Sequence, residues 1–178
     1  TFAINHMSYF TLTKELLPVL KATENARVVS VASEAHRSGR FLPENLQLTR
    51  GYNTFKAYGN SKLFNIMFAR ELAKRIEGTG ITSYSLHPGV VNTGFAKESK
   101  SFFATLFNLG RAFMISPDKG AETSLYLCLE KGIQHLNGRY FVKKKPAKPS
   151  VKDATDDAKC AELWEVSDRQ LSELDRIN

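Results

Sequence analysis

The chain has 178 residues, a formal net charge of +7, 42% hydrophobic residues and 24% charged residues. This length and composition fit one globular domain and exclude a disordered or fibrous chain. No apolar run reaches the roughly 18 residues that a membrane span requires. The two cysteines and four histidines match no metal or redox motif, so we expect a reduced, intracellular protein without a metal site.

The positive charge raises the chance of an anionic partner, such as a phosphorylated cofactor, a membrane surface or a nucleic acid. The most basic segment is diluted by Pro146 and Pro149, so its ordinary interpretation is a solvated loop. We therefore expect no nucleic-acid binding. The segment contains Lys143, Lys144, Lys145 and Lys148.

In chain order, the first predicted element is a helix that ends near Lys21, because apolar residues recur at helical spacing before it. Residues 28–32 are apolar and β-branched, which indicates a strand buried on both faces. Residues 34–54 contain glycine, proline and polar residues, which favour a loop with room for a short turn. Residues 55–76 have the clearest helical periodicity.

Residues 81–86 predict a second strand, which Pro88 and Gly89 end. Residues 96–115 form an apolar, aromatic stretch of helical character. Ser116 and Pro117 then predict the N-cap and first residue of a further helix. Residues 138–142 predict a third short strand, residues 143–150 a linker, and residues 153–174 a polar terminal helix.

This alternation of helices and strands predicts a parallel sheet with helices on both faces. Ligands of such sheets bind beyond the carboxyl ends of the strands, where Ser33 follows the first strand. Tyr58 and Lys62, four residues apart, share one face of the long helix. An ammonium beside a phenol lowers the tyrosine pKa, and such a tyrosine can exchange a proton with an alcohol or carbonyl oxygen. Redox chemistry would also require a nicotinamide, because side chains supply no hydride.

Each of these features also has an ordinary interpretation when it is taken singly. Tyr58 and Lys62 would then be a surface pair on a helix, worth a few tenths of a kcal/mol. Ser33 would be a loop serine or a helix cap, Asn5 another cap, and Pro88 with Gly89 a turn that ends a strand.

The order of these features is more informative than any one of them. Four motifs follow one another: Asn5-His6, Arg27-Val-Val-Ser-Val-Ala-Ser33, Tyr58-Gly-Asn-Ser-Lys62 and His87-Pro-Gly-Val-Val-Asn-Thr93. Together they resemble the short-chain dehydrogenase/reductase family. The retinol-dehydrogenase-like branch is indicated by Ser33-Glu-Ala-His36, Tyr52-Asn-Thr, Leu86-His-Pro-Gly89 and Glu162-Leu-Trp-Glu165. The resemblance implies an α/β fold, the C-terminal part of a Rossmann-like doubly wound parallel sheet with about three strands and flanking helices.

The resemblance also implies a role for each matching residue. Tyr58 would be the general acid/base, Lys62 would lower its pKa and hold the nicotinamide ribose, and Ser33 would orient the reacting oxygen. Asn5 would hold a water that links Lys62 to solvent. The residues implied for the nicotinamide are Tyr58, Lys62, Pro88, Gly89, Val91 and Thr93. Ala32 departs from the family pattern, which usually has a serine there.

The substrate side is implied less directly. In this family a mobile lid follows the second strand, and here that stretch carries Phe95, Phe102 and Phe103. An aromatic lid suits a small apolar alcohol or carbonyl compound, either retinoid-like or lipid-derived. Alternatively, these aromatic residues pack in the core, against a partner or at a membrane. Peripheral membrane contact, a location in the cytoplasm or on the cytosolic face of a membrane, and a homo-oligomer are all compatible with the sequence.

The glycine-rich turn that holds the cofactor pyrophosphate in this family is not found in this sequence. We therefore expect residues 1–178 to be a partial dehydrogenase domain: 1–95 the catalytic core segment, 96–116 the lid, and 117–178 the last helix-strand unit with the terminal helix. The chain could be part of an intact enzyme, a cleaved piece, or a short protein without a cofactor site. NADP is the expected cofactor, with NAD as the alternative. A non-catalytic interaction module or an inactive fragment is the competing function.

Overall fold

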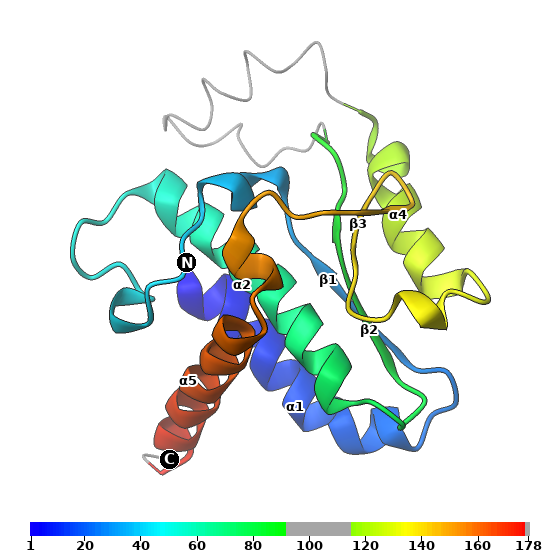
Figure 1. Cartoon of the computed structure of the whole chain (residues 1–178), viewed down its shortest axis with the longest axis horizontal. Helices are drawn as coiled ribbons and strands as arrows, with labels where there is room; N and C mark the ends of the chain where they lie inside the picture. Colours follow the sequence, from blue (N-terminus) through cyan, green and yellow to red (C-terminus); the bar gives the residue numbers. More distant parts are fainter. Residues whose placement is uncertain (92–114, 177–178) are drawn as a thin grey trace.

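The computed structural model describes residues 1–91 and 115–176. Figure 1 shows a four-stranded sheet with helices packed on it. The strands are β1 (Arg27–Val31), β2 (Thr82–His87), β3 (Tyr140–Val142) and β4 (Lys145–Ala147). The α-helices are α1 (Ser8–Lys21), α2 (Thr54–Arg75), α4 (Pro117–Leu129) and α5 (Asp157–Asp175). The sheet has the order β1-β2-β3-β4, in which the first three strands are parallel.

The last strand of the sheet corrects a prediction. Residues 143–150 were expected to be a linker, but β4 pairs antiparallel with β3. Lys143 and Lys144 form the two-residue turn between them, with φ angles of 50° and 63°. Such turns usually carry asparagine or glycine, and Pro146 argues against a strand, so no local signal predicts this hairpin.

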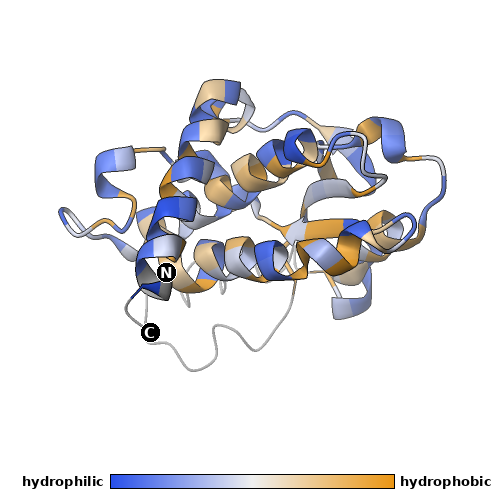
Figure 2. Ribbon diagram, turned by 90° about the horizontal axis from the view of Figure 1, so that it is seen from below, coloured by the Kyte–Doolittle hydropathy of each residue, from blue (hydrophilic) through white to orange (hydrophobic). Residues whose placement is uncertain are grey.

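Helices cover both faces of the sheet, as predicted. Tyr84 and Leu86 of β2 pack with Leu127 of α4 on one face. Because side chains alternate along a strand, Ser83 and Ser85 point to the opposite face, which α2 covers. Helices α1 and α5 pack beside α2 in this second layer (Figures 1 and 2). The predicted α/β fold is therefore confirmed.

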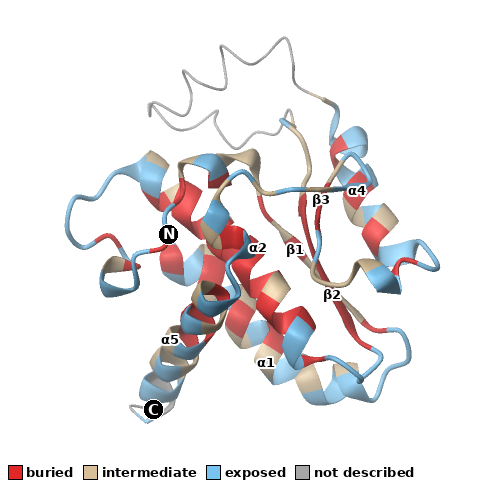
Figure 3. Ribbon diagram, in the orientation of Figure 1, coloured by how far each residue is buried: buried red, intermediate tan, exposed pale blue. Residues whose placement is uncertain are grey.

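Helix α2 is the most buried helix of the described chain (Figure 3). The Asn53 side chain accepts a hydrogen bond from the Lys56 amide and so caps its first turn. At the start of α4, Ser116 is the N-cap and Pro117 the first helical residue, which confirms the prediction. The terminal helix begins later than expected, because Lys152–Thr155 form a separate 3-10 turn before α5.

Strand β1 is less buried than predicted. Val28, Val29 and Val31 are half-buried, and Ser30 is the only fully buried residue of the strand. Within the described residues β1 pairs on one side only, with β2, so its other edge has no neighbouring strand. Apolar side chains are also exposed on α1, namely Leu12, Leu16 and Val19. Among the described helices, none combines the length and the apolar character needed to cross a bilayer.

Candidate active site

The candidate site lies at the carboxyl ends of β1 and β2. After β1 the chain turns into a 3-10 helix, Glu34–Ser38, whose N-cap is Ser33. The Ser33 hydroxyl accepts a hydrogen bond from the Ala35 amide at 3.2 Å. We call residues 33–38 the serine turn. This local hydrogen bond, typical of serine at a helix start, holds the Ser33 side chain where the strand ends.

Tyr58 and Lys62 lie one turn apart on α2, next to the serine turn. The Ser33 hydroxyl lies close enough to the Tyr58 phenol to lower its pKa. The Lys62 Nζ atom lies 5.6 Å from the centre of the Tyr58 ring and donates a hydrogen bond to the Val31 carbonyl at 3.1 Å. A phenol, a hydroxyl and an ammonium are thus gathered at the end of β1.

Two glycines permit this close approach of α2 to the serine turn. A Cβ atom added to Gly59 would lie well inside van der Waals distance of Ser38 Oγ and 2.9 Å from the Ala35 carbonyl oxygen. A Cβ added to Gly39 would lie 2.8 Å from the Gly59 carbonyl oxygen. Gly59 directly follows Tyr58. Because it has no side chain, α2 can approach the serine turn closely enough for the Tyr58 phenol to lie beside Ser33.

Asn5 contacts the same helix from the start of the chain. It lies in a π-helical turn, Ala3–Met7, a distortion that is frequent at functional sites. Its side-chain amide donates to Ser61 Oγ at 3.2 Å, and Ser61 donates to the Tyr58 carbonyl at 2.7 Å. Asn5 therefore reaches the Tyr58–Lys62 turn through Ser61.

Burial is the main influence on the ionisation of this site. It raises the pKa of Tyr58, an effect that the hydrogen bond from Ser33 opposes. Burial lowers the pKa of Lys62. The pKa of Tyr58 is therefore raised, whereas a lowering by Lys62 was expected. The loss of solvent around the phenolate outweighs its favourable contacts.

The segment after β2 forms the other wall of the site. Gly89 has a φ of +98°, and an added Cβ would lie 2.6 Å from Ile115 Cδ1. Val91 pairs with Ile115 in an isolated parallel bridge. Pro88, Gly89 and Val91 are therefore held at the carboxyl end of β2. Thr93 and the lid residues Phe95, Phe102 and Phe103 lie outside the described residues.

A cavity of about 860 Å³ opens beside this wall. Pro88, Val90, Ile115 and Val142 give it an apolar lining, while lysines from the β3–β4 turn and α4 also border it. It lies next to the serine turn, because Glu34 and Arg37 line it too. A cavity of this size and mixed lining suits a small molecule with both apolar and polar parts.

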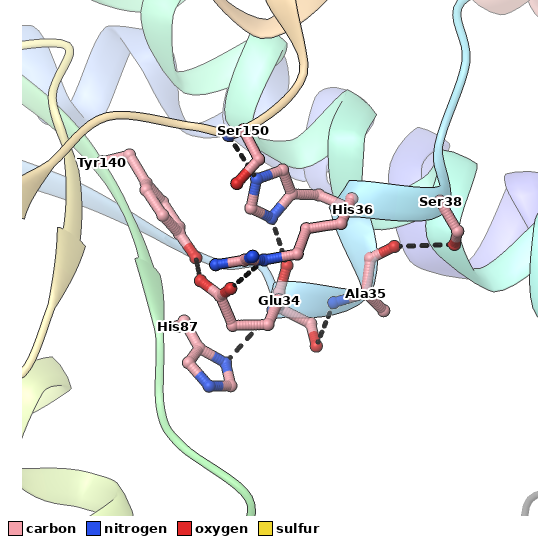
Figure 4. A network of polar contacts seen from close by, with 9 residues as sticks. Glu34, Ala35, His36, Ser38, His87, Tyr140 and Ser150 are labelled. Carbon is pink, nitrogen blue, oxygen red and sulfur yellow. Dashed lines mark hydrogen bonds and ion pairs between the residues drawn. The ribbon is translucent and has the colours of Figure 1, made fainter.

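A polar network that the sequence did not reveal surrounds the serine turn (Figure 4). The Tyr140 hydroxyl donates to the Glu34 carboxylate at 3.0 Å, and the Glu34 amide donates to His87 Nδ1 at 3.3 Å. His36 contacts both Ser33 and Ser150. Burial, and after it the nearby Glu34 carboxylate, raise the pKa of Tyr140, so it stays a neutral donor. Within the described chain, no group of three acidic, histidine or cysteine residues could hold a metal ion.

A sequence profile described as short chain dehydrogenase matches residues 1–102. The chain belongs to this family. It is 41% identical to retinol dehydrogenase 12 of Homo sapiens over 164 residues, which are 92% of this chain and 51% of that protein. It is 38% identical to retinol dehydrogenase 14 of Mus musculus over 170 residues, 94% of this chain and 51% of that protein.

Solved structures share the fold of this chain. An uncharacterised protein from Mycobacterium paratuberculosis superposes with a TM-score of 0.68 at 30% identity, covering 93% of this chain and 56% of that one. The carbonyl reductase Sniffer of D. melanogaster, at 18% identity and a TM-score of 0.55, covers 82% of this chain and 54% of its own and shows the fold alone. The chain spans about half the length of the curated relatives it matches.

Proposed function

We propose that the protein is an NAD(P)-dependent oxidoreductase that interconverts an apolar alcohol and its aldehyde or ketone. One observation carries the proposal: the Ser33 hydroxyl and the Lys62 ammonium both lie beside the Tyr58 phenol, at the carboxyl end of a parallel strand. Ligands of open α/β sheets bind at this edge.

Tyr58 is the proton-transfer group in this proposal. In alcohol oxidation its phenolate takes the proton of the substrate hydroxyl, and in carbonyl reduction its phenol returns a proton to the substrate oxygen. Ser33 donates a hydrogen bond to that oxygen and holds it in place. Lys62 stabilises the phenolate by its positive charge, and Asn5 connects this turn of α2 to a water-mediated relay.

The residues of the site fit the nicotinamide end of the cofactor. Lys62 and Tyr58 offer donors for the ribose hydroxyls. The absence of a side chain at Gly89 lets the Ile115 side chain pack against the backbone at the carboxyl end of β2. When bound, the nicotinamide supplies or accepts the hydride, which no side chain can do. NADP is proposed over NAD on the resemblance to the retinol-dehydrogenase-like branch.

The substrate proposal is a retinoid-like or lipid-derived alcohol or carbonyl compound. The apolar lining beside Pro88 and Val90 supports it, as do the names of the relatives, which are retinol dehydrogenases. Phe95, Phe102 and Phe103 are proposed to complete the substrate side.

The test is turnover of the full-length protein with NADPH and NADH against a panel of apolar aldehydes and alcohols. Tyr58→Phe should lower kcat by at least about a hundredfold, because it removes the exchangeable proton. Tyr52→Phe is the matched control, since Tyr52 is 61% exposed and lies just before the start of α2. Equal loss in both variants, or retained activity in Tyr58→Phe, would contradict the assignment. Absence of both turnover and cofactor binding would favour a non-catalytic interaction module.

A further inference from the structure

His36 connects the serine turn to a segment more than one hundred residues further along the chain. The ring is buried, with 1% of its surface exposed. Its Nδ1 atom lies 2.7 Å from the Ser33 carbonyl oxygen, and its Nε2 atom lies 3.1 Å from the Ser150 amide nitrogen. Figure 4 shows the ring beside Ser150.

The two partners determine which ring nitrogen carries the proton. The Ser150 amide can only donate, so Nε2 must present its lone pair. The Ser33 carbonyl can only accept, so Nδ1 must carry hydrogen. The contacts therefore select the neutral Nδ1–H tautomer, which donates to Ser33 and accepts from Ser150 at the same time.

The surroundings hold the ring in this orientation. The Tyr140 ring packs against His36 edge to face, with the ring centres 5.3 Å apart and an angle of 68°. The Tyr140 hydroxyl is itself held by the Glu34 carboxylate in the same turn. A side chain fixed by both packing and hydrogen bonds can hold its partner closely in place.

The His36 ring is bonded to the backbone of Ser33, the serine that lies beside Tyr58. The Ser33 carbonyl accepts from the His36 amide at 3.1 Å as well as from the His36 ring. Two donors on one carbonyl fix the peptide plane after Ser33. That plane contains the Glu34 amide, which donates to His87 Nδ1, and the amide of the next peptide, that of Ala35, donates to the Ser33 hydroxyl. Rotation of this plane would change the direction in which the hydroxyl points.

We propose that His36 is a positioning residue that orients Ser33 through its carbonyl, and that the bond from Ser150 maintains the tautomer this requires. This inference rests on the proposed function, because it assigns His36 a part in the same reaction. His36 touches neither substrate nor cofactor, so its effect is expected on kcat and not on the KM for the cofactor.

Two substitutions test the two ring nitrogens of His36 separately. Asparagine places an amide N–H near the position of Nδ1, so His36→Asn keeps a donor for Ser33 and loses the acceptor for Ser150. Glutamine places an amide oxygen near the position of Nε2, so His36→Gln keeps the acceptor and loses the donor. Each variant loses one hydrogen bond, so their thermal unfolding temperatures should fall by similar amounts.

The kinetic result should differ between them. His36→Asn should keep kcat within about threefold of the wild type, whereas His36→Gln should lower kcat about tenfold, the equivalent of one lost hydrogen bond. The KM for NADPH should stay the same in both. Equal values of kcat in the two variants, or values that follow the unfolding temperature, would show a purely structural residue and overturn the proposal.

A measurement without turnover separates this inference from the proposed function. Nitrogen NMR of histidine-labelled protein should show one protected Nδ1–H signal that is lost in His36→Gln. Its absence overturns the role of His36 even if the wild type is inactive on every substrate. An inactive wild type that shows the signal contradicts the proposed function and removes the catalytic part of the inference with it.

Discussion

Replacing Gly59 by alanine tests whether the contact between α2 and the serine turn places Tyr58. Alanine in a helix interior is normally more favourable than glycine by about 1 kcal/mol. Here the added methyl group would lie 2.9 Å from the Ala35 carbonyl oxygen and still closer to Ser38 Oγ, whereas ordinary contacts begin at 3.4 Å. Overpacking of this kind costs about 1–3 kcal/mol. We expect a net destabilisation of up to about 2 kcal/mol.

The expected effects are measurable in two assays. For a domain of this size, a change of that magnitude lowers the unfolding temperature by up to about 8 °C. Displacement of α2 by about 1 Å would separate Tyr58 from Ser33, and a misplacement of that size can lower turnover about a hundredfold. Calorimetry and steady-state turnover of Gly59→Ala therefore report the two consequences separately.

Ser38→Ala provides the control for this experiment. It removes the hydroxyl nearest the new methyl group, at the loss of a 2.9 Å hydrogen bond to the Ala35 carbonyl. The double variant should recover part of the unfolding temperature and of the turnover lost in Gly59→Ala, so the two substitutions should be non-additive. A Gly59→Ala protein with a raised unfolding temperature and wild-type turnover would refute the reasoning.

Two further predictions concern pH. Burial raises the pKa of Tyr58, and oxidation needs its phenolate. The kcat/KM for alcohol oxidation should therefore keep rising with pH to about pH 10, while carbonyl reduction stays level through the neutral range; an oxidation plateau below neutrality would argue against Tyr58 as the base. Burial also lowers the pKa of His6 from 6.5 to about 3. As the pH falls, His6 therefore binds a proton in the unfolded chain before it does so in the folded chain. The stability that neutral His6 contributes should be lost as the pH falls from 6.5 towards 3. In urea unfolding, His6→Phe should show less acid destabilisation than the wild type, and parallel pH profiles would exclude His6 as the cause.

The elements that the sequence predicted are those with local signals. Helix α2 follows from apolar spacing, and the start of α4 from Ser116 with Pro117. The hairpin of β3 and β4 has no such signal, because two lysines occupy its left-handed turn. The half-buried valines of β1 were also missed, since burial depends on neighbouring strands and not on the strand itself.

The same distinction applies to the candidate site. Ser33, Tyr58 and Lys62 could be found because residue type and spacing along the chain carry their chemistry. The contribution of His36 could not be found in this way, because its partner Ser150 is distant in the sequence. The hydrogen bond between them also uses the Ser150 backbone amide, which almost any residue would offer. Gly59 within the tyrosine motif resembles any helix glycine until the serine turn is placed against it.

The position of Tyr58 depends on small side chains on both sides of α2. Toward the serine turn these are Gly39 and Gly59. Toward the sheet they are Ser30, Ser83 and Ser85, which are buried and whose hydroxyl groups have no hydrogen-bond partner among the described residues. Such hydroxyls cost free energy that a larger apolar residue would avoid, so their small volume explains them better than their polarity. Larger residues at these positions would push α2 outward and carry Tyr58 with it, whereas the exposed apolar residues of α1 have no comparable connection to the site.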